Sequence, residues 1–291
     1  MKKVLVIFLI FSGAILNAQD SLLDALEEET QDMSYKVEAI FKGTRLINGH
    51  SIETRKKGNL DFLISHRFGT VNSGAYNLFG LDQSNVRIGF DYGITDNINA
   101  GFGRNSFQKT FDGYLKYRLV GQKTKGGSPV AVTALASMAI KTLKDPVFED
   151  VIDFSNRLTY AYQVLLARKI SPKLSLQLMP TMVHFNALQP EQKTHDIFAG
   201  GVGGRVKLTQ RLSLNMEYYH QFNTLVTGMQ NSLAVGFDIE TGGHVFQLHL
   251  TNSRAMIEKG FITETTDDFF NGDIRFGFNI ARTFQLGNSK E

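Results

Sequence analysis

Hydrophobic and polar residues alternate along most of this chain, and the stretch 197–222 shows the pattern most clearly. In its first half Phe198 and Val202 share one parity with other apolar residues, while glycine and basic residues occupy the other parity. The alternation breaks at the polar residues 209–211 and resumes around Leu214. Successive side chains of a strand point to opposite faces of a sheet. The stretch therefore predicts a β-hairpin with one hydrophobic face and one polar face.

The same alternation recurs from residue 58 to the C-terminus, and no helical period separates one segment from the next. Each segment has close to the ~10 residues that a tilted strand needs to cross a bilayer. We therefore predict an all-β protein, a transmembrane antiparallel up-and-down β-barrel of about twelve strands. The predicted strands are 58–69, 85–94, 98–104, 109–122, 130–140, 157–170, 174–184, 197–208, 212–222, 230–240, 244–251 and 272–286.

Short and long connections alternate between these segments, which is typical of a meander. The short turns are 95–97, 171–173, 209–211 and 241–243, and the longer polar connections are 142–155, 186–195, 223–229 and 253–271. Outer-membrane barrels keep short turns on the periplasmic side and long loops outside. An even number of strands then places both ends of the barrel in the periplasm. A barrel of about fourteen strands is the alternative, and it requires a break hidden in a segment such as 253–271.

The N-terminus has the features of a secretory signal peptide over residues 1–18. Two lysines follow the first methionine, and the stretch 4–15 is apolar. This stretch is shorter than the ~20 residues of a spanning helix, which favours cleavage over a retained anchor. We expect three parts: the signal peptide 1–18, a segment 19–57 that lies in the periplasm or enters the lumen as a small plug, and the transmembrane β-barrel 58–291.

A soluble β-sandwich would produce the same alternation, because it too buries one face of each strand. The export signal, the glycine-rich polar parity and the aromatic residues near strand ends favour the barrel. These aromatic residues are Tyr92, Tyr117, Tyr160, Tyr162, Tyr218 and Phe284. We therefore place the protein in the bacterial outer membrane, with the surrounding lipid as a partner.

Composition narrows the possible functions. Hydrophobic residues make up 42% of the chain, a moderate share that suits a barrel whose apolar residues alternate with polar ones. There is no cysteine, which excludes disulfides, thiolate zinc sites and a lipidated N-terminal cysteine. The formal net charge of +3 includes the two lysines of the signal peptide. So balanced a charge argues against a nucleic-acid partner.

Four runs in the first third of the chain carry a family resemblance: LDFLISHRFG (60–69), LFGLD (78–82), NVRIGFDYGITDN (85–97) and GFGRNS (101–106). They resemble a family of Bacteroidetes outer-membrane β-barrel proteins named domain of unknown function 5777. The resemblance extends from about residue 36 to the C-terminus. It implies location and architecture, and the family brings no established substrate or reaction.

Charged residues on the inward parity are the candidate functional residues. Because an isolated buried charge costs several kcal/mol, they must pair or stay hydrated. They can form a structural filling of paired side chains, or they can line a slightly cationic passage for small polar or anionic solutes. The lumen-facing candidates are Arg67, Arg87, Asp91, Asp112, Lys116, Arg118, Arg157, Arg205, Lys207, Glu217, Asp238 and Arg275.

Other motifs give little support for catalysis or for a cofactor. The seven histidines form no paired metal spacing. Ser65 and His66 are sequence neighbours on opposite faces, so they cannot act as a nucleophile and its base. The glycines at 200–204 lie within a strand and lack the Lys-Ser/Thr ending of a phosphate loop. The acidic stretch 145–153 does not have EF-hand spacing. We expect neither an enzyme nor a bound metal or cofactor.

Three functions remain open. The first is a channel or transporter for small polar solutes, with the inward cations shaping selectivity. The second is a non-conducting structural or docking barrel that binds a protein partner at its periplasmic tail or at an extracellular loop such as 253–271. An outer-membrane hydrolase is the remote third.

Overall fold

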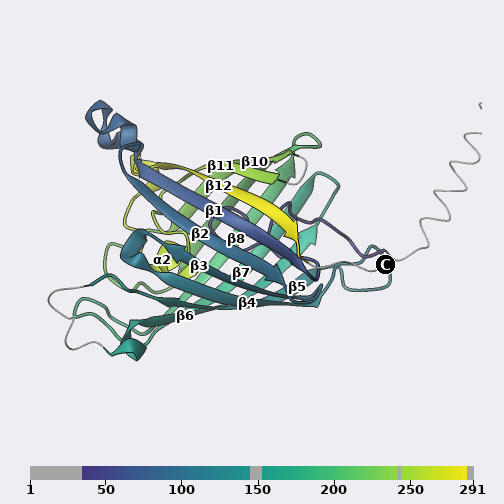
Figure 1. Ribbon diagram of the computed structural model, residues 1–291, viewed down its shortest axis with the longest axis horizontal. Coiled ribbons are helices and arrows are strands. Elements are labelled where there is room, and N and C mark those ends of the chain that lie inside the picture. The colour runs from purple at the N-terminus through teal and green to yellow at the C-terminus, as the bar shows by residue number, and fades with distance from the viewer. Residues whose placement is uncertain (1–34, 145–152, 242–243, 287–291) are drawn as a thin grey trace, which may run out of the picture.

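The computed structural model describes residues 35–144, 153–241 and 244–286. They form one closed barrel of twelve antiparallel strands, each paired with its neighbours in chain order (Figure 1). The last strand, β12, closes the barrel on the first, β1, with Ile64 opposite Ile280. No helix in the described parts is long and apolar enough to cross a membrane.

The strands are close to those that the alternation predicts, and no boundary differs by more than three residues. The strands are β1 (Asn59–Thr70), β2 (Ser84–Gly93), β3 (Ile98–Asn105), β4 (Phe111–Val120), β5 (Ala131–Ile140), β6 (Leu158–Lys169), β7 (Leu174–Phe185), β8 (Asp196–Lys207), β9 (Leu212–Gln221), β10 (Ser232–Thr241), β11 (His244–Thr251) and β12 (Arg275–Gln285). The predicted up-and-down barrel of twelve strands is confirmed.

Short helices occur only in connections among the described residues. They are the 3₁₀ turns η1 (Val71–Ser73), η2 (Ala75–Gly80), η3 (Phe107–Lys109), η4 (Phe154–Arg157) and η5 (Phe269–Asn271), and the α-helix α2 (Glu258–Thr263). The stretch 253–271, which the fourteen-strand alternative needed for extra strands, therefore holds α2 and η5. All six residues of α2 are buried, because this connection folds back into the lumen.

The two faces of the wall follow the predicted parities. In the hairpin of β8 and β9, the side chains of Phe198, Val202 and Met216 are 50%, 45% and 50% exposed on the outside, where they meet lipid. On the opposite parity Arg205 and Glu217 are buried inside the barrel. The connection after β4 is longer than the other described turns at this end, and it binds the incoming chain, because Val37 donates a backbone hydrogen bond to Gln122 at 2.8 Å.

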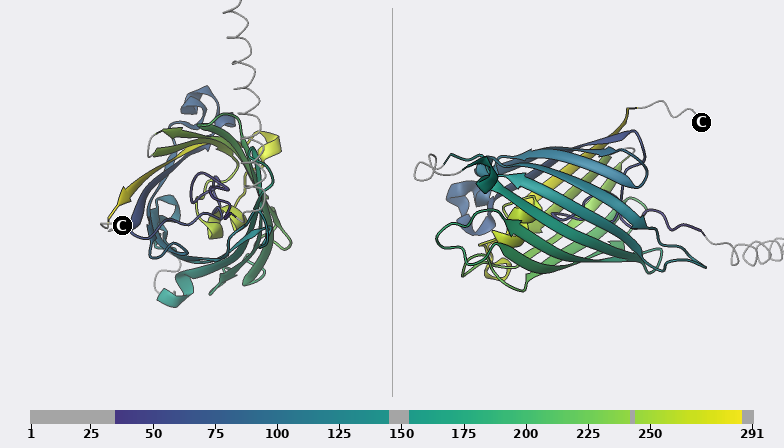
Figure 2. Two further views of the ribbon diagram at one scale, coloured as in Figure 1. Left: turned by 90° about the vertical axis from the view of Figure 1, so that its right-hand side faces the viewer. Right: turned by 90° about the horizontal axis from the view of Figure 1, so that it is seen from below.

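The lumen is filled by the chain itself. Residues 40–52 enter from the end that carries the chain termini, and the connection 253–265 enters from the opposite end (Figure 2). The first insert contains a small hairpin, which we call the plug hairpin (44–51), closed by backbone hydrogen bonds from Leu46 to Gly49 and from Ser51 to Thr44. One side of the lumen is apolar. Its cluster includes Ile40, Phe41, Leu46, Ile52, Leu165, Met179, Val183, Ile197, Tyr219, Phe261 and Ile262.

Candidate functional site

Eight of the twelve candidate residues lie buried in the lumen, and four of them (Arg67, Asp91, Lys116 and Glu217) bind the chain's own inserts. The eight are Arg67, Arg87, Asp91, Asp112, Lys116, Arg205, Glu217 and Asp238. The other four lie toward the rims. Arg118 pairs with Glu53 at 3.3 Å, Arg157 is in η4, Lys207 ends β8, and Arg275 donates to Asp267 at 2.8 Å.

Lys116 on β4 holds the chain that leaves the plug hairpin. Its ammonium donates hydrogen bonds to the backbone carbonyls of Ser51 and Glu53, both at 2.8 Å. Lys116 is 1% exposed, so its ammonium has lost its hydration. The hydrogen bonds to these carbonyls compensate for that loss. The ammonium of Lys116, which points into the lumen, therefore binds main-chain oxygens of the insert and is not available to a solute.

Glu217 on β9 holds the tip of the plug hairpin. Its carboxylate accepts hydrogen bonds from the consecutive backbone N–H groups of Ile47, Asn48 and Gly49, the shortest at 2.7 Å from Asn48. Successive N–H groups that converge in this way form a concave anion site, here filled by a carboxylate of the wall. Arg67 on β1 binds the same tip, because it donates to the side-chain oxygen of Asn48 at 2.7 Å.

Neutral side chains around the barrel complete the hold on the hairpin. Amide nitrogens of the wall donate to backbone carbonyls of the hairpin at 2.7–2.9 Å: Gln247 to Leu46, Asn279 to Ile47 and Gln177 to His50. Because these donors come from β7, β11 and β12, the hairpin is bound from several directions at once. Loss of such a donor would leave a buried carbonyl unpaired and destabilise the bound hairpin by about 1–3 kcal/mol.

The fit of the hairpin against β9 depends on a glycine. A Cβ built on Gly49 would lie far inside van der Waals distance of the hydroxyl oxygen of Tyr219 and 3.2 Å from the adjoining ring carbon. The Tyr219 hydroxyl itself donates to the sulfur of Met179 at 3.0 Å, and the ring is fully buried. No larger residue fits at position 49 without movement of the hairpin or of Tyr219.

The insert from the other end meets the plug hairpin inside the barrel. Glu258 of α2 lies 3.4 Å from the guanidinium of Arg45 and 3.5 Å from the ring of His50. Burial, followed by the positive charges of Arg45, Lys116 and Arg87, lowers the pKa of His50 well below its usual value, so its ring is neutral at pH 7. Burial raises the pKa of Glu258, and Arg45 opposes that shift. Arg45 is therefore the charge partner of Glu258.

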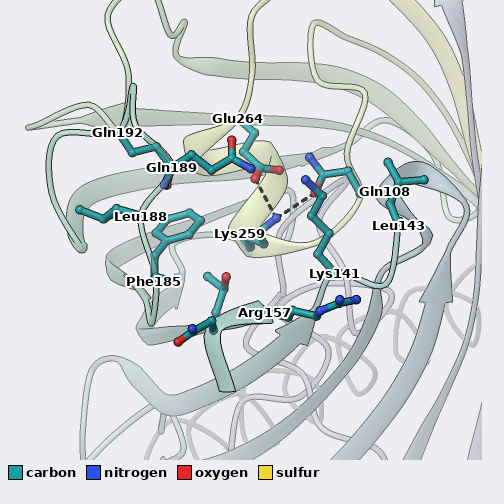
Figure 3. A pocket seen from close by; sticks show the side chains of 13 residues that line it. Gln108, Lys141, Leu143, Arg157, Phe185, Leu188, Gln189, Gln192, Lys259 and Glu264 are labelled. Carbon is teal, nitrogen blue, oxygen red and sulfur yellow. Dashed lines mark hydrogen bonds and ion pairs between the residues drawn. The ribbon is translucent and has the colours of Figure 1, made fainter. Parts of the chain in front are cut away.

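A pocket of about 150 Å³ lies at the end of the barrel opposite the chain termini (Figure 3). The turn lengths predict that this end is extracellular, and we call it the extracellular mouth. Lys259 of α2 extends into it and binds Glu264 at 2.7 Å and the side-chain oxygen of Gln108 at 2.9 Å. Lys141 and Arg157 also line it. Of the twelve candidates, Arg157 alone belongs to this pocket. The acidic stretch 145–153 falls almost wholly outside the described residues.

Sequence reasoning left open whether the segment 19–57 enters the lumen, and it did not predict that the connection 253–265 enters from the other end. The segment 40–48 alternates poorly because almost all of its side chains are buried and share no exposed face. One local signal was present: Asn48-Gly49 follows Leu46-Ile47, and Asn-Gly is a strong hairpin-turn dipeptide. No described group of three or more histidine, aspartate or glutamate side chains could hold a metal ion.

Lys116→Met should loosen the plug hairpin. The substitution keeps the length of the side chain but leaves the carbonyls of Ser51 and Glu53 without their charged donor, which costs about 2–3 kcal/mol. We expect trypsin to cleave the folded variant within 42–57 faster than it cleaves the wild type. Lys207→Met is the matched control, because that lysine ends β8 at the rim and its side chain forms no hydrogen bond or ion pair with a plug residue among the described residues. Equal cleavage rates for all three proteins would show that Lys116 does not hold the insert.

The match to a protein-family model agrees with the architecture. The family model described as "Membrane bound beta barrel domain (DUF5777)" matches residues 41–284, a range that begins inside the lumen-filling insert. Among solved structures, the chain is similar to the NanC porin (TM-score 0.49, 10% identity, covering 78% of this chain and 100% of that one). It is also similar to the KdgM porin (TM-score 0.45, 8% identity, 78% and 99%) and to Omp33 of Acinetobacter baumannii (TM-score 0.42, 9% identity, 78% and 99%).

No curated protein sequence matches the chain. The family match covers most of its length, and the fold is a closed barrel with a lipid-facing apolar surface. The protein is thus a bacterial outer-membrane β-barrel, and the chain belongs to the membrane-bound β-barrel family DUF5777.

Proposed function

We propose that this protein is an outer-membrane channel for small polar or anionic solutes that its own chain closes. The observation that carries the proposal is the way in which the plug hairpin (44–51) is held. Wall side chains bind it through separate hydrogen bonds, and no strand of the barrel pairs with it. The hairpin can therefore leave the lumen without breaking any pairing that closes the barrel.

The wall that the hairpin would leave behind supports a polar passage. Some of its charges are paired within the wall itself: Arg87 binds Asp112 with a 2.9 Å hydrogen bond. Others, such as Lys116 and Arg67, now bind groups of the insert and would become available to solutes. Donors of this kind favour anionic or strongly polar solutes over apolar ones.

Removal of residues 40–53 should open the channel. In planar bilayers we expect the wild-type protein to be closed for most of the recording and the deletion variant to conduct continuously, because the deletion removes the chain that fills the lumen from one end. Assembly of the variant is checked first by its heat-modifiable migration in gels. An assembled deletion variant that stays silent would overturn the channel proposal.

A non-conducting structural barrel is the second candidate, and the apolar cluster favours it. Ile40, Phe41, Leu46 and Ile52 pack against apolar side chains of β6–β9, so part of the insert is bound like a protein core. Burial of each such side chain contributes about 1.5–3 kcal/mol, which resists withdrawal. This candidate predicts that the deletion variant either fails to assemble or assembles without conductance.

A further inference from the structure

The pocket at the extracellular mouth has the dimensions of a small-molecule site. Its walls come from η3, the segment after β5, η4, the segment after β7 and α2, so five separate parts of the chain converge on it (Figure 3). A cavity of similar volume, about 150 Å³, is enough to hold a benzene ring. The pocket therefore accommodates a compact ligand or the end of a longer one.

The charge of this pocket is unbalanced. Among the described residues, three cations (Lys141, Arg157 and Lys259) line it against one carboxylate, Glu264. Glu264 pairs with Lys259 at 2.7 Å. Neither Lys141 nor Arg157 forms an ion pair with any carboxylate of the described residues, although both are half-buried. Two partly desolvated cations beside one cavity attract an anion, and a guanidinium can bind a carboxylate with two parallel hydrogen bonds.

Uncharged polar groups make up much of the remaining lining. Gln108, Asn156, Thr159, Gln189 and Gln192 each contribute a side chain that can donate and accept hydrogen bonds. Such groups match hydroxyls, which also donate and accept. A site for an inorganic anion without hydroxyls would not need these additional amide and hydroxyl side chains.

The turn η3 is held in a strained conformation that aims Gln108 at the pocket. Gln108 and Lys109 have φ angles of +54° and +49°, which are uncommon for residues other than glycine. Leu143 donates a backbone hydrogen bond to Gln108 at 3.1 Å, and the Thr142 hydroxyl donates to the carbonyl of Lys109. Strained residues of this kind cluster at active sites, ligand clamps and switch regions.

We infer that this pocket binds a small hydroxylated carboxylate, with Arg157 and Lys141 at the carboxylate and the amide side chains at the hydroxyls. The inference deepens the proposed function, on which its biological role rests, because it names the solute class that the channel meets first. Lys259 in the pocket is the sequence neighbour of Glu258, which contacts Arg45 and His50 of the plug hairpin. An occupant that touches Lys259 thus touches the helix that meets the plug.

Isothermal titration of the purified, folded full-length protein at low salt tests the site with gluconate, sorbitol and inorganic phosphate. Sorbitol keeps the hydroxylated six-carbon chain of gluconate but lacks the carboxylate. We expect saturable binding of gluconate, at least roughly tenfold weaker binding of sorbitol and equally weak binding of phosphate, since a charge-assisted hydrogen bond contributes about a factor of ten or more.

Two variants connect the binding to the pocket. Lys141→Gln combined with Arg157→Gln should weaken gluconate binding by roughly tenfold or more. Lys193→Gln removes one positive charge from an exposed residue outside the pocket lining, and it should leave the affinity unchanged. Undetectable gluconate binding, equal loss in the Lys193 variant, or phosphate binding as tight as gluconate would each overturn the inference.

The outcomes for the site and for the channel are separable. Gluconate binding that depends on Lys141 and Arg157, together with a deletion variant that stays silent in bilayers, would support the site and contradict the channel. A conducting deletion variant with no gluconate binding in the full-length protein would support the channel and contradict the site.

Discussion

Val202→Arg should prevent the barrel from assembling in the membrane. Val202 is near the middle of β8, its side chain is 45% exposed on the outer face, and its neighbours across β7 and β9 are Leu178 and Tyr218. A lipid-facing arginine near the bilayer midplane costs about 2–4 kcal/mol. We expect the folded, heat-modifiable form to be largely lost when the variant is refolded into lipid vesicles.

Val206→Arg is the matched control on the same strand and the same face. It lies one residue from the end of β8, where the guanidinium reaches the interface and the cost falls to about 0–1 kcal/mol. We therefore expect nearly normal assembly. If Val202→Arg assembles as well as the wild type, the outer face is not the lipid-facing face. If both variants fail equally, the effect does not depend on depth and the strand is misplaced relative to the membrane.

Gly49→Ala should displace the plug hairpin and raise the conductance of the channel. The new methyl group would overlap the hydroxyl oxygen of Tyr219, and overpacking of a filled interior costs about 1–3 kcal/mol. A penalty of this size shifts a closed-to-open ratio by roughly five- to a hundredfold. Single-channel recordings should show a corresponding rise in the open fraction.

Tyr219→Phe provides the rescue that identifies the cause. Removal of the hydroxyl leaves a ring carbon 3.2 Å from the added methyl group, a contact that a small shift relieves. The hydroxyl donates a bond to the Met179 sulfur, a weak acceptor, so Tyr219→Phe alone should behave like the wild type. The double variant should return most of the way to the closed state. A double variant as open as Gly49→Ala would show that the overlap with Tyr219 does not explain the effect.

The strands could be predicted because barrel alternation is a local signal. Successive residues of β8 or β9 point to opposite faces of the wall. One face meets lipid and the other meets the lumen, so apolar and polar residues alternate along the sequence. The inward charges were found for the same reason. Their partners were not, since the contact of Lys116 with Ser51, or of Glu217 with Asn48, joins residues far apart in the chain.

Hydrophobic periodicity does not predict the structure of the two inserts. The connection 253–271 looked like a polar extracellular loop, yet Met256, Ile257, Phe261 and Ile262 within it are buried in the lumen. These apolar residues were the available signal, and short helices such as α2 give too few turns for a helical period to appear. The pocket at the extracellular mouth is likewise assembled from five separate segments, so no single stretch of sequence predicts it.

Hydrogen exchange of the plug hairpin tests the central claim most directly. In wild-type protein refolded into lipid vesicles, the backbone amides of Asn48 and Gly49 bind Glu217 inside the barrel. We predict that peptides covering 44–51 exchange as slowly as those of β8 and β9, and that Glu217→Ala speeds their exchange while leaving the strands protected. Exchange of 44–51 at the rate of an unprotected peptide, with the strands still protected, would contradict the account, because the hairpin would then lie outside the lumen.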